Sequence, residues 1–287
     1  MKVAVCISGQ YRFYDKAVRN IIENLIEPHD CDVFCYFSND TEVYFKEKTK
    51  PEEIIGTVVD YFGDAVKNIG IDTSDFQVKK ENPTGSPTAW ADNLQRMMDA
   101  YGNVHPRTKK VELCNNLRTN YEEEINEKYD IVVSIRSDFM FEKPFTFEEN
   151  IKDNTVYCIG RDVSGFPRVW DGFWYAKGDT FTTACSHIIN WFPSMDGIKE
   201  DANELFDKLR IGHFIFSPEN SLIYNWVIKN GFDVEVFDTP ATILRSSGEL
   251  HKYETFKPLD SKIATNLPRG LKLKDENCIE GLTHLCK

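Results

Sequence analysis

The sequence lacks the motifs of several large enzyme classes. It has no G-x-G-x-x-G loop and no Walker phosphate-binding loop, which argues against a dinucleotide-binding enzyme or a P-loop ATPase. It has no H-E-x-x-H motif and no Ser-His-Asp order, so zinc proteolysis and nucleophilic hydrolysis have little support. Internal repeats, low-complexity tracts and obvious linkers are also missing, which favours a single domain over residues 1–287.

Long apolar runs and paired cysteine motifs are absent as well. No apolar segment approaches the roughly 20 residues needed to span a bilayer, so we expect no transmembrane segment. The first apolar run, Met1–Ile7, is too short for a signal peptide and fits a strand. The eight cysteines have no C-x-x-C spacing, and Cys6, Cys31, Cys35 and Cys158 lie in apolar runs. We therefore expect reduced core thiols in a cytoplasmic protein, and no cysteine zinc site.

Positive charge is in short supply. The 34 Lys and Arg residues face 46 Asp and Glu residues, which gives a net charge of −12. This balance argues against nucleic acid or an anionic membrane as the main partner. A phosphate-bearing ligand would have to be bound locally, by a few arginines, by backbone N–H groups or through a metal ion.

The beginning of the chain predicts a strand–helix–strand unit. Val3–Ile7 is an apolar strand, and an apolar stripe with helical spacing runs from about Asp15 to Ile26, where Pro28 should end the helix. Asp32–Phe37 is expected to be the next strand. A right-handed crossover would make the two strands parallel neighbours. We therefore expect an α/β fold of Rossmann-like type, with a mostly parallel central sheet flanked by helices.

The further elements follow from similar patterns. A helical face with Ile54, Val58, Val59 and Phe62 buried is expected within residues 40–80. Other expected helices lie at 90–101, 111–128 and 179–191, and one begins at Ser217–Pro218 and ends at Asn230–Gly231. Strands are expected at 77–80 and 154–159, with a loop over 160–170 and a last, more exposed strand at 232–237.

The most informative segment is the apolar run Ile131–Ile135, followed by Arg136 and Asp138. Its nearly continuous β-branched residues are typical of a strand buried on both faces of a parallel sheet. Ligands of open α/β sheets bind beyond the carboxyl ends of the strands, so these two charged side chains should border a crevice. They could also form a surface ion pair. However, the apolar residues Phe139–Phe141 that follow favour a functional pair that suits a phosphate and possibly its divalent metal ion.

A second candidate is the loop Ser8-Gly-Gln-Tyr-Arg12 between the first strand and the first helix. Gly9 allows a ligand to approach the backbone closely, and Arg12 could bind a phosphate through two hydrogen bonds. The alternative is a simple strand-to-helix turn with a surface arginine.

Three more residues have both a functional and a structural interpretation. Asp171 lies among aromatic residues that could form a sugar platform, or it is a turn residue before Gly172. Glu219 could act as a base, although an acidic residue is also favoured in the first turn of a helix. His251 could reach the crevice from beyond the last strand, or it could be structural.

Together these motifs resemble a known family. They are Ser-Gly-Gln-x-Arg, Asp-Val-Phe, Tyr-Asp-x-Val-x-x-x-Arg-x-Asp-x-x-Phe, Asp-x-Phe and Pro-Glu-Asn-x-Leu, and they extend over roughly residues 1–246. The pattern is similar to nucleotide-sugar-dependent glycosyltransferases of the GT-A type from polysaccharide clusters of bacteria and from large DNA viruses. The resemblance implies that residues 1–150 bind the nucleotide sugar, residues 151–250 bind the acceptor, and residues 251–287 form a carboxy-terminal wrap or tail.

The resemblance also implies roles for the candidate residues. The nucleotide would be held by Ser8, Gly9, Gln10 and Arg12. Asp138 matches the last aspartate of the metal-binding Asp-x-Asp motif and Arg136 replaces the first, so the arginine itself could neutralise the diphosphate. A Mn²⁺ or Mg²⁺ ion would be bound by Asp138, with His251 as a weaker match.

The implied reaction is transfer of a hexosyl or pentosyl group from a nucleoside-diphosphate sugar, with UDP favoured, to a glycan hydroxyl. Glu219 or Asp171 would be the base if the enzyme inverts the anomeric centre. Two alternatives stay open. One is a non-catalytic nucleotide- or carbohydrate-binding module on the same fold, and the other is a different phosphate-ester enzyme.

Overall fold

The computed structural model describes residues 1–39, 48–73, 106–163, 166–186, 226, 231–237, 241–244, 250–252 and 271–273. Within these ranges it describes the backbone but not the side chains of residues 106, 160–163, 166–171, 186, 236–237, 241, 250–252 and 271–273. All statements below concern this part of the chain.

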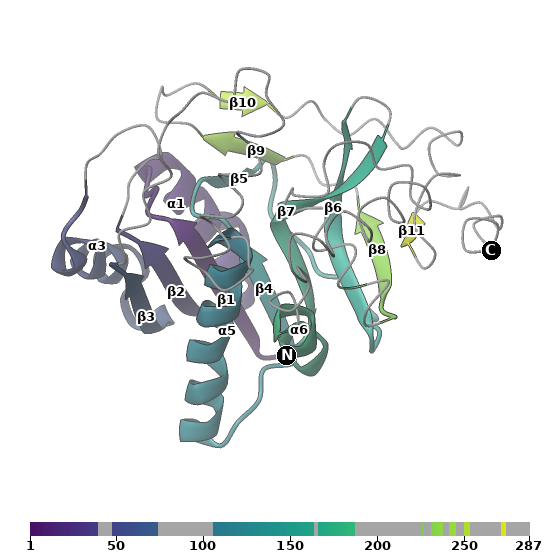
Figure 1. The fold of residues 1–287 in the computed structure, drawn as a ribbon, viewed down its shortest axis with the longest axis horizontal. Helices are drawn as coiled ribbons and strands as arrows, with labels where there is room; N and C mark the ends of the chain where they lie inside the picture. Colours follow the sequence, from purple (N-terminus) through teal and green to yellow (C-terminus); the bar gives the residue numbers. More distant parts are fainter. Residues whose placement is uncertain are drawn as a thin grey trace, which may run out of the picture.

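The centre of the fold is an eight-stranded sheet with the order β11-β8-β6-β7-β4-β1-β2-β3 (Figure 1). Its strands are β1 (Val3–Gln10), β2 (Asp32–Ser38), β3 (Val66–Asp72), β4 (Ile131–Ile135), β6 (Thr155–Val163), β7 (Phe166–Lys177), β8 (Asp233–Phe237) and β11 (Leu271–Leu273). Strand β7 runs antiparallel to both of its neighbours, β4 and β6, and every other neighbouring pair is parallel. The expected α/β fold with a mostly parallel sheet is therefore confirmed.

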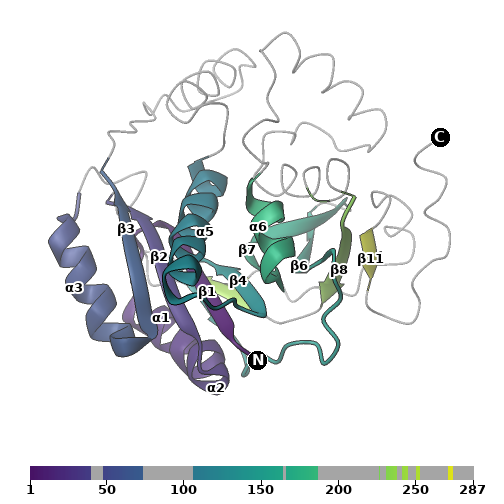
Figure 2. The same ribbon diagram turned by 90° about the horizontal axis from the view of Figure 1, so that it is seen from below.

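Helices cover both faces of this sheet. They are α1 (Asp15–Ile21), its π-helical continuation η1 (Ile22–Ile26), α2 (Glu27–His29), α3 (Pro51–Phe62), the 3-10 turn η2 (Gly63–Ala65), α5 (Pro106–Ile125) and α6 (Gly178–Ser186). Helices α5 and α6 lie on one face, and α1 and α2 lie on the other (Figure 2).

The alternation of side chains along the strands divides the apolar interior into two cores. Val5 of β1 and Val133 of β4 pack with residues of α1 and α3, such as Val18. Cys6 of β1 and Val132 of β4 pack with residues of α5 and α6. Because successive side chains of a strand point to opposite faces, β4 is buried on both of them, as the sequence predicts.

A second, three-stranded antiparallel sheet lies near the carboxyl ends of β1 and β4, at the top of Figure 1. It consists of β5 (Phe139–Phe141), β9 (Ala241–Leu244) and β10 (Leu250–Lys252), with β9 in the middle. Strand β5 begins four residues after the end of β4, so the segment that joins the two sheets contains Arg136 and Asp138.

Several expected elements are wrong in extent or type. Residues 66–72 form strand β3 instead of helix, because this edge strand is only half-buried and shows no apolar run. Val59 is 45% exposed and does not belong to the buried face of α3. Helix continues through Pro28, which occupies the first turn of α2, where no hydrogen bond from its nitrogen is needed. Helix α5 begins at Pro106, before the expected residue 111, and ends at Ile125.

Within the expected loop over residues 160–170, residues 160–163 and 166–169 are instead paired parts of β6 and β7, with Arg161 opposite Arg168 and Val163 opposite Phe166. Glycine and proline in this segment suggested a loop, but antiparallel pairing satisfies the backbone of both strands. The strand near 232–237 is confirmed as β8, although it lies inside the sheet between β6 and β11 and is not the last strand.

Some expectations lie outside the described residues. They are the strand at 77–80, the helix at 90–101 and the helix that starts at Ser217–Pro218, of which only the buried Trp226 is described. The six cysteines that the structure describes are buried and form no disulfide, as expected. Within the same part of the chain, no helix is both long enough and apolar enough to cross a membrane. The domain halves and the cytoplasmic location stay predictions.

Candidate functional site

The candidate site lies where β1 and β4 end, at the same edge of the sheet. Ile7 of β1 is paired with Ile135 of β4, so Ser8 and Arg136 continue the two strands side by side. On the other side of β1, Gln10 is paired with Ser38 at the end of β2. The topology thus brings the Ser8–Arg12 segment and the Arg136–Asp138 segment together, although more than 120 residues separate them in the sequence.

A tight turn fixes the backbone of Arg136 and Asp138. The Phe139 nitrogen donates a hydrogen bond to the Arg136 carbonyl oxygen at 3.2 Å, which closes a four-residue turn. The Arg136 nitrogen donates to the Gly172 carbonyl in β7 at 3.1 Å. The Leu244 nitrogen in β9 donates to the Asp138 carbonyl at 2.9 Å. The turn is therefore attached to both sheets.

The chain after this turn is attached to α1. The Asn20 side chain accepts a hydrogen bond from the Phe141 nitrogen at 2.6 Å and donates one to the Phe141 carbonyl oxygen at 2.9 Å. Phe139 and Phe141 themselves are buried, and both pack edge-on or tilted against Phe173 of β7. These contacts hold Asp138 at the strand ends.

Two arginines bind the Asp138 carboxylate. Arg136 donates from Nε to Oδ1 at 2.8 Å and from Nη2 to Oδ2 at 2.7 Å, which is a bidentate ion pair. Arg12 donates from Nη1 to Oδ2 at 3.1 Å. The Asp138 side chain is only 2% exposed, so this is a buried carboxylate and not the surface ion pair that the sequence left open.

The electrostatics of Asp138 follow from this arrangement. Burial alone would raise the pKa of the carboxyl group, because a charge is poorly solvated there. The charges and hydrogen bonds of Arg136 and Arg12 outweigh burial and lower the pKa of Asp138 from 3.8 to about 2. Asp138 is therefore ionised at neutral pH and keeps both guanidinium groups close to each other.

Both arginines also retain contact with solvent. The Arg12 side chain is 15% exposed and the Arg136 side chain is 20% exposed, so neither guanidinium group is sealed inside the protein. Arg12 donates a further hydrogen bond to the Gln10 side-chain oxygen, which orients it. The partly exposed guanidinium groups offer an anion a place to bind at the strand ends.

A third arginine, which the sequence analysis missed, approaches the same strand ends from α5. Arg107 Nη1 donates to the Ser8 carbonyl oxygen and lies 3.2 Å from the Ser8 hydroxyl oxygen. Gly9 permits this approach, since a β-carbon at that position would lie 3.0 Å from Arg107 Nη1. The Gly9 φ angle of +135° also favours glycine.

The first turn of α5 carries a signal that could have identified Arg107. It reads Pro106-Arg-Thr-Lys-Lys and has no acidic residue. Helix macrodipoles favour anionic side chains at the amino terminus and disfavour cations there. Arg107 at this end contacts Ser8 at the strand ends, and its position therefore suits a site for an external anion.

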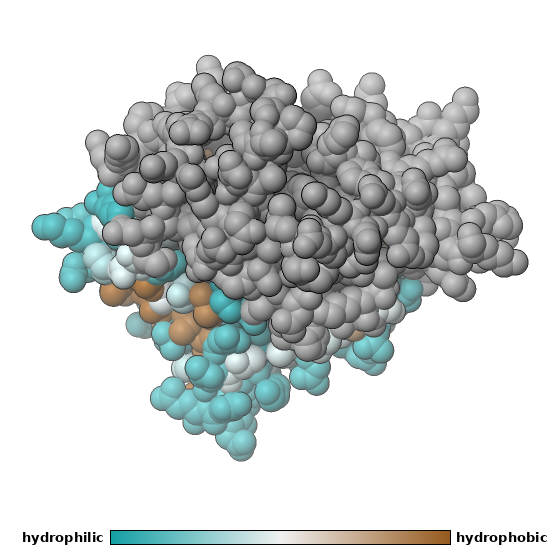
Figure 3. Space-filling view, in the orientation of Figure 1, coloured by the Kyte–Doolittle hydropathy of each residue, from teal (hydrophilic) through white to brown (hydrophobic). Residues whose placement is uncertain are grey.

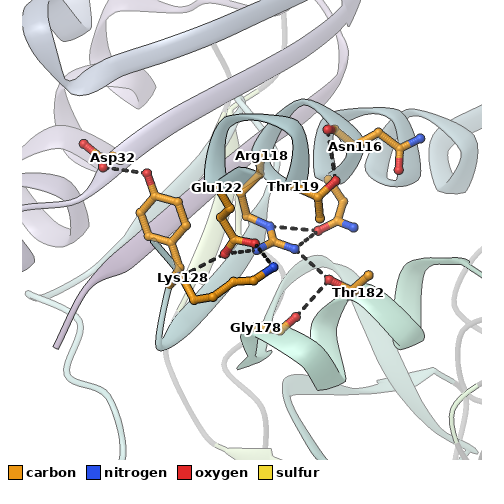
Figure 4. Close-up of polar contacts among 10 residues, drawn as sticks. Asp32, Asn116, Arg118, Thr119, Glu122, Lys128, Gly178 and Thr182 are labelled. Atoms are coloured by element: carbon orange, nitrogen blue, oxygen red, sulfur yellow. Dashed lines mark hydrogen bonds and ion pairs between the residues drawn. The ribbon is translucent and has the colours of Figure 1, made fainter. Parts of the chain in front are cut away.

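A buried polar network fixes α5 in place (Figure 4). Arg118, 1% exposed, donates to Glu122 Oε1 at 2.5 Å, to Asn115 Oδ1 at 2.9 and 3.0 Å, and to Thr182 Oγ1 of α6 at 2.6 Å. Glu122 Oε1 also accepts a hydrogen bond from the Tyr129 nitrogen at 2.9 Å, just before β4. The network therefore joins α5 to α6 and to the start of β4, and it sets the position from which Arg107 extends.

The other predicted site residues are only partly described. The backbone of Asp171 precedes Gly172, which binds the Arg136 nitrogen, so Asp171 lies on the strand next to the turn, while its side chain is outside the described set. The neighbouring Phe173 and Trp174 are both buried in the cores and offer no sugar platform.

The structure describes the backbone of His251 but not its side chain, and it does not describe Glu219. His251 is paired with Ile243, which is paired with Phe139, so its backbone lies two strands away from the residue after Asp138. Its side chain, and all of Glu219, lie outside the described residues. Their roles stay predictions.

Asn39 is a further polar residue at this edge of the sheet that the sequence analysis did not select. It directly follows β2, and the residue is 7% exposed. Its side-chain oxygen is buried and has no hydrogen-bond partner among the described residues. A ligand that reached the end of β2 could satisfy this oxygen.

A groove between α1 and α3 has the wrong charge for a phosphate. Glu23, Glu27 and Asp60 line it, together with the single cation Arg19. In the view of Figure 3 the described surface is mostly hydrophilic, with a small apolar area between α3 and α5. Within the described part of the chain, the strand ends are therefore the better anion site, because the guanidinium groups of Arg12 and Arg136 share one carboxylate there and Arg107 contacts Ser8 beside them.

Comparisons with known proteins give partial matches to solved structures. No protein-family model and no curated protein matches the chain. Among solved structures, the chain is similar to the glycosyltransferase GlyE of Streptococcus pneumoniae TIGR4. Its apo form has 12% identity and a TM-score of 0.35, and a further crystal structure of GlyE has 13% identity and a TM-score of 0.36. In both cases the alignment covers 82% of this chain and 45% of GlyE, so the chain spans less than half the length of that enzyme.

Proposed function

We propose that the protein is a glycosyltransferase of the GT-A type that moves a sugar from a nucleoside-diphosphate sugar to a hydroxyl group of a glycan. The observation that carries the proposal is the pair of partly exposed guanidinium groups, Arg12 and Arg136, held by the buried Asp138 at the ends of β1 and β4. This is the edge at which α/β sheets bind ligands, and bidentate arginines suit phosphate oxygens.

In the proposed reaction, the bond between the anomeric carbon and the diphosphate breaks, and its electron pair leaves with the nucleoside diphosphate. Negative charge therefore grows on the leaving group. Arg12 and Arg136 would stabilise this charge, since preorganised cations act most strongly where charge develops. The Ser8–Gln10 segment would hold the nucleotide, and UDP is the favoured donor nucleotide.

The acceptor oxygen forms the new bond to the anomeric carbon, and its hydroxyl proton passes to a carboxylate. Glu219 or Asp171 would accept this proton in an inverting enzyme. The backbone of Asp171 next to Gly172, the residue that binds the turn, is compatible with this role. The order of events requires no covalent intermediate on the protein.

The test is release of the nucleotide from a panel of UDP- and GDP-sugars, with and without glycan acceptors, measured by chromatography. The wild-type protein should release UDP from one donor, and an acceptor should accelerate the release. Arg136→Gln should slow it by about tenfold or more, because charge-assisted hydrogen bonds contribute roughly 1.5–3 kcal/mol.

Arg19→Gln is the matched control, since Arg19 lies on α1 and forms an exposed pair with Asp15. It should not change the rate of release. Binding of a nucleotide sugar without any release would instead support a non-catalytic module. Failure to bind any member of the panel, measured by calorimetry, would contradict both functions.

A further inference from the structure

Enzymes with an Asp-x-Asp motif use its carboxylates to bind a metal ion. For Asp138 to do the same, its carboxylate oxygens would have to be available to the ion. Oδ1 of Asp138 accepts a hydrogen bond from Arg136 Nε, and Oδ2 accepts hydrogen bonds from Arg136 Nη2 and Arg12 Nη1. Each carboxylate oxygen is therefore already bound to a cationic group. A divalent ion on the same oxygens would meet two positive charges at close range.

The neighbourhood of Asp138 is also poor in metal ligands. Across the described residues, no group of three or more His, Cys, Asp or Glu side chains is close enough to bind a metal ion. Hard divalent cations such as Mg²⁺ and Mn²⁺ prefer several oxygen ligands, of which carboxylates are the strongest. The described residues at this edge of the sheet therefore suit an anion and do not fit a metal ion.

The cationic groups approach this edge from three separate segments. Arg12 comes from the chain after β1, Arg136 from the turn after β4, and Arg107 from the first turn of α5. Arg12 and Arg136 both bind the Asp138 carboxylate, so two guanidinium groups share this one negative charge. The amino terminus of the 20-residue helix α5 adds further positive potential.

We propose that the chain binds the diphosphate of its donor through Arg12, Arg107 and Arg136 without a divalent metal ion, and that Asp138 is a positioning residue for these arginines. The proposal rests on the proposed glycosyltransferase function and specifies how the donor is recognised. Asp138 holds two guanidinium groups together that would otherwise repel each other. Their partly exposed edges then bind the phosphate oxygens.

The experiment is calorimetric binding of UDP and of UMP to the full chain, in EDTA, in Mg²⁺ and in Mn²⁺. We expect UDP to bind in EDTA with an affinity within about threefold of that in either metal ion. UDP should bind about tenfold or more tightly than UMP under all three conditions, since the second phosphate reaches more charge-assisted hydrogen bonds.

The outcomes separate this inference from the function on which it rests. Binding of UDP that is lost in EDTA and restored by Mn²⁺ would overturn the metal-free site and leave the glycosyltransferase proposal intact. No binding of UDP or any other nucleoside diphosphate under any condition would overturn both.

Variants test the positioning role of Asp138. If Asp138 positions the arginines, Asp138→Asn should weaken UDP binding by the same factor in EDTA and in Mn²⁺. If Asp138 is a metal ligand, the substitution should weaken binding only in the presence of the metal ion, which would contradict the proposal.

Arg136 provides a second set of variants in case Asp138→Asn does not fold. Arg136→Gln should lose about tenfold or more in UDP affinity in EDTA, and Arg136→Lys should recover only part of the loss, because lysine cannot form the bidentate contact. Arg19→Gln serves as the unaffected control. UDP affinity in EDTA that does not change in Arg136→Gln would also overturn the proposal.

Discussion

At the scale of single residues, Asp138 and Arg136 define the site through their mutual contacts. A carboxylate that is 2% exposed would be costly without partners, and Asp138 has two. The sequence alone predicts that both residues follow a strand, because an apolar run that ends in charged residues can be recognised without a structure. The sequence could not show that the carboxylate binds the guanidinium groups of its neighbour and of Arg12.

Because the pKa of Asp138 is lowered in the folded protein, its contribution to the free energy of unfolding decreases as the pH falls. Its folded-state pKa of about 2 lies below the ordinary value of 3.8, so its contribution is present above pH 3.8. The contribution is lost as the pH falls towards 2, and it amounts to about 2 kcal/mol of unfolding free energy. Urea unfolding between pH 6 and pH 2.5 would measure it.

In Asp138→Asn this part of the acid dependence should disappear. The variant is expected to be less stable at neutral pH, because both arginines lose their shared partner. Its stability should then fall less steeply than that of the wild type below pH 4. Parallel curves for the two proteins would show that the ion pairs do not lower the pKa of Asp138.

Arg107 is a residue of the candidate site that was not predicted from the sequence. Its distance of about a hundred residues from Ser8 in the sequence hides their contact. The positive φ angle and the close approach of Arg107 both favour glycine at position 9, whereas the sequence suggested only the close approach of a ligand. The sequence signal for Arg107 is the positive charge in the first turn of α5, which the helix macrodipole disfavours.

At the scale of elements, the site depends on the placement of α5. This helix packs on the sheet beside α6, and the charged groups of its buried network around Arg118 all have partners (Figure 4). The length of α5 exceeds the sequence estimate at its amino-terminal end, which is the end that carries Arg107. The apolar periodicity did not reveal this first turn because it is mostly basic.

Removing Arg118 should therefore destabilise the whole fold. Arg118→Met would leave the Glu122 carboxylate buried with the exposed Lys128 as its remaining charged partner. Loss of one member of a buried ion pair typically costs about 3–5 kcal/mol. Urea denaturation of the variant, compared with the exposed-pair control Arg19→Gln, would measure the difference.

The double variant Arg118→Met, Glu122→Gln provides the internal check. It removes the uncompensated charge, and it keeps an acceptor for the Tyr129 nitrogen. We expect it to be at least about 1 kcal/mol more stable than Arg118→Met alone. A double variant that is as unstable as the sum of both single variants would contradict a coupled buried pair.

The predicted elements succeeded where burial produced a local pattern. β1, β2, β4 and the α1 region have uninterrupted or periodic apolar residues, and all are confirmed. The strand β3 and the paired segments of β6 and β7 were missed, since their strand structure depends on partners elsewhere in the chain. Local propensity cannot report such pairing.

At the scale of the whole molecule, the order of the strands gathers distant segments at one edge. β1 lies between β2 and β4, so residues 8–12, 38–39 and 136–138 meet there, and α5 brings Arg107 to the same edge. The chain as a whole has a net charge of −12, yet Arg12, Arg107 and Arg136 all lie at the edge where α/β sheets bind ligands. Acidic composition and a local anion site are therefore compatible.

The most direct test of the central claim is a crystal structure of the protein with UDP. The account predicts that the diphosphate lies at the ends of β1 and β4, with its oxygens within about 3.2 Å of guanidinium nitrogens of Arg12 and Arg136. The Asp138 carboxylate should still bind both arginines. A diphosphate bound elsewhere, or one linked to Asp138 through a metal ion after the arginines have turned away, would contradict it.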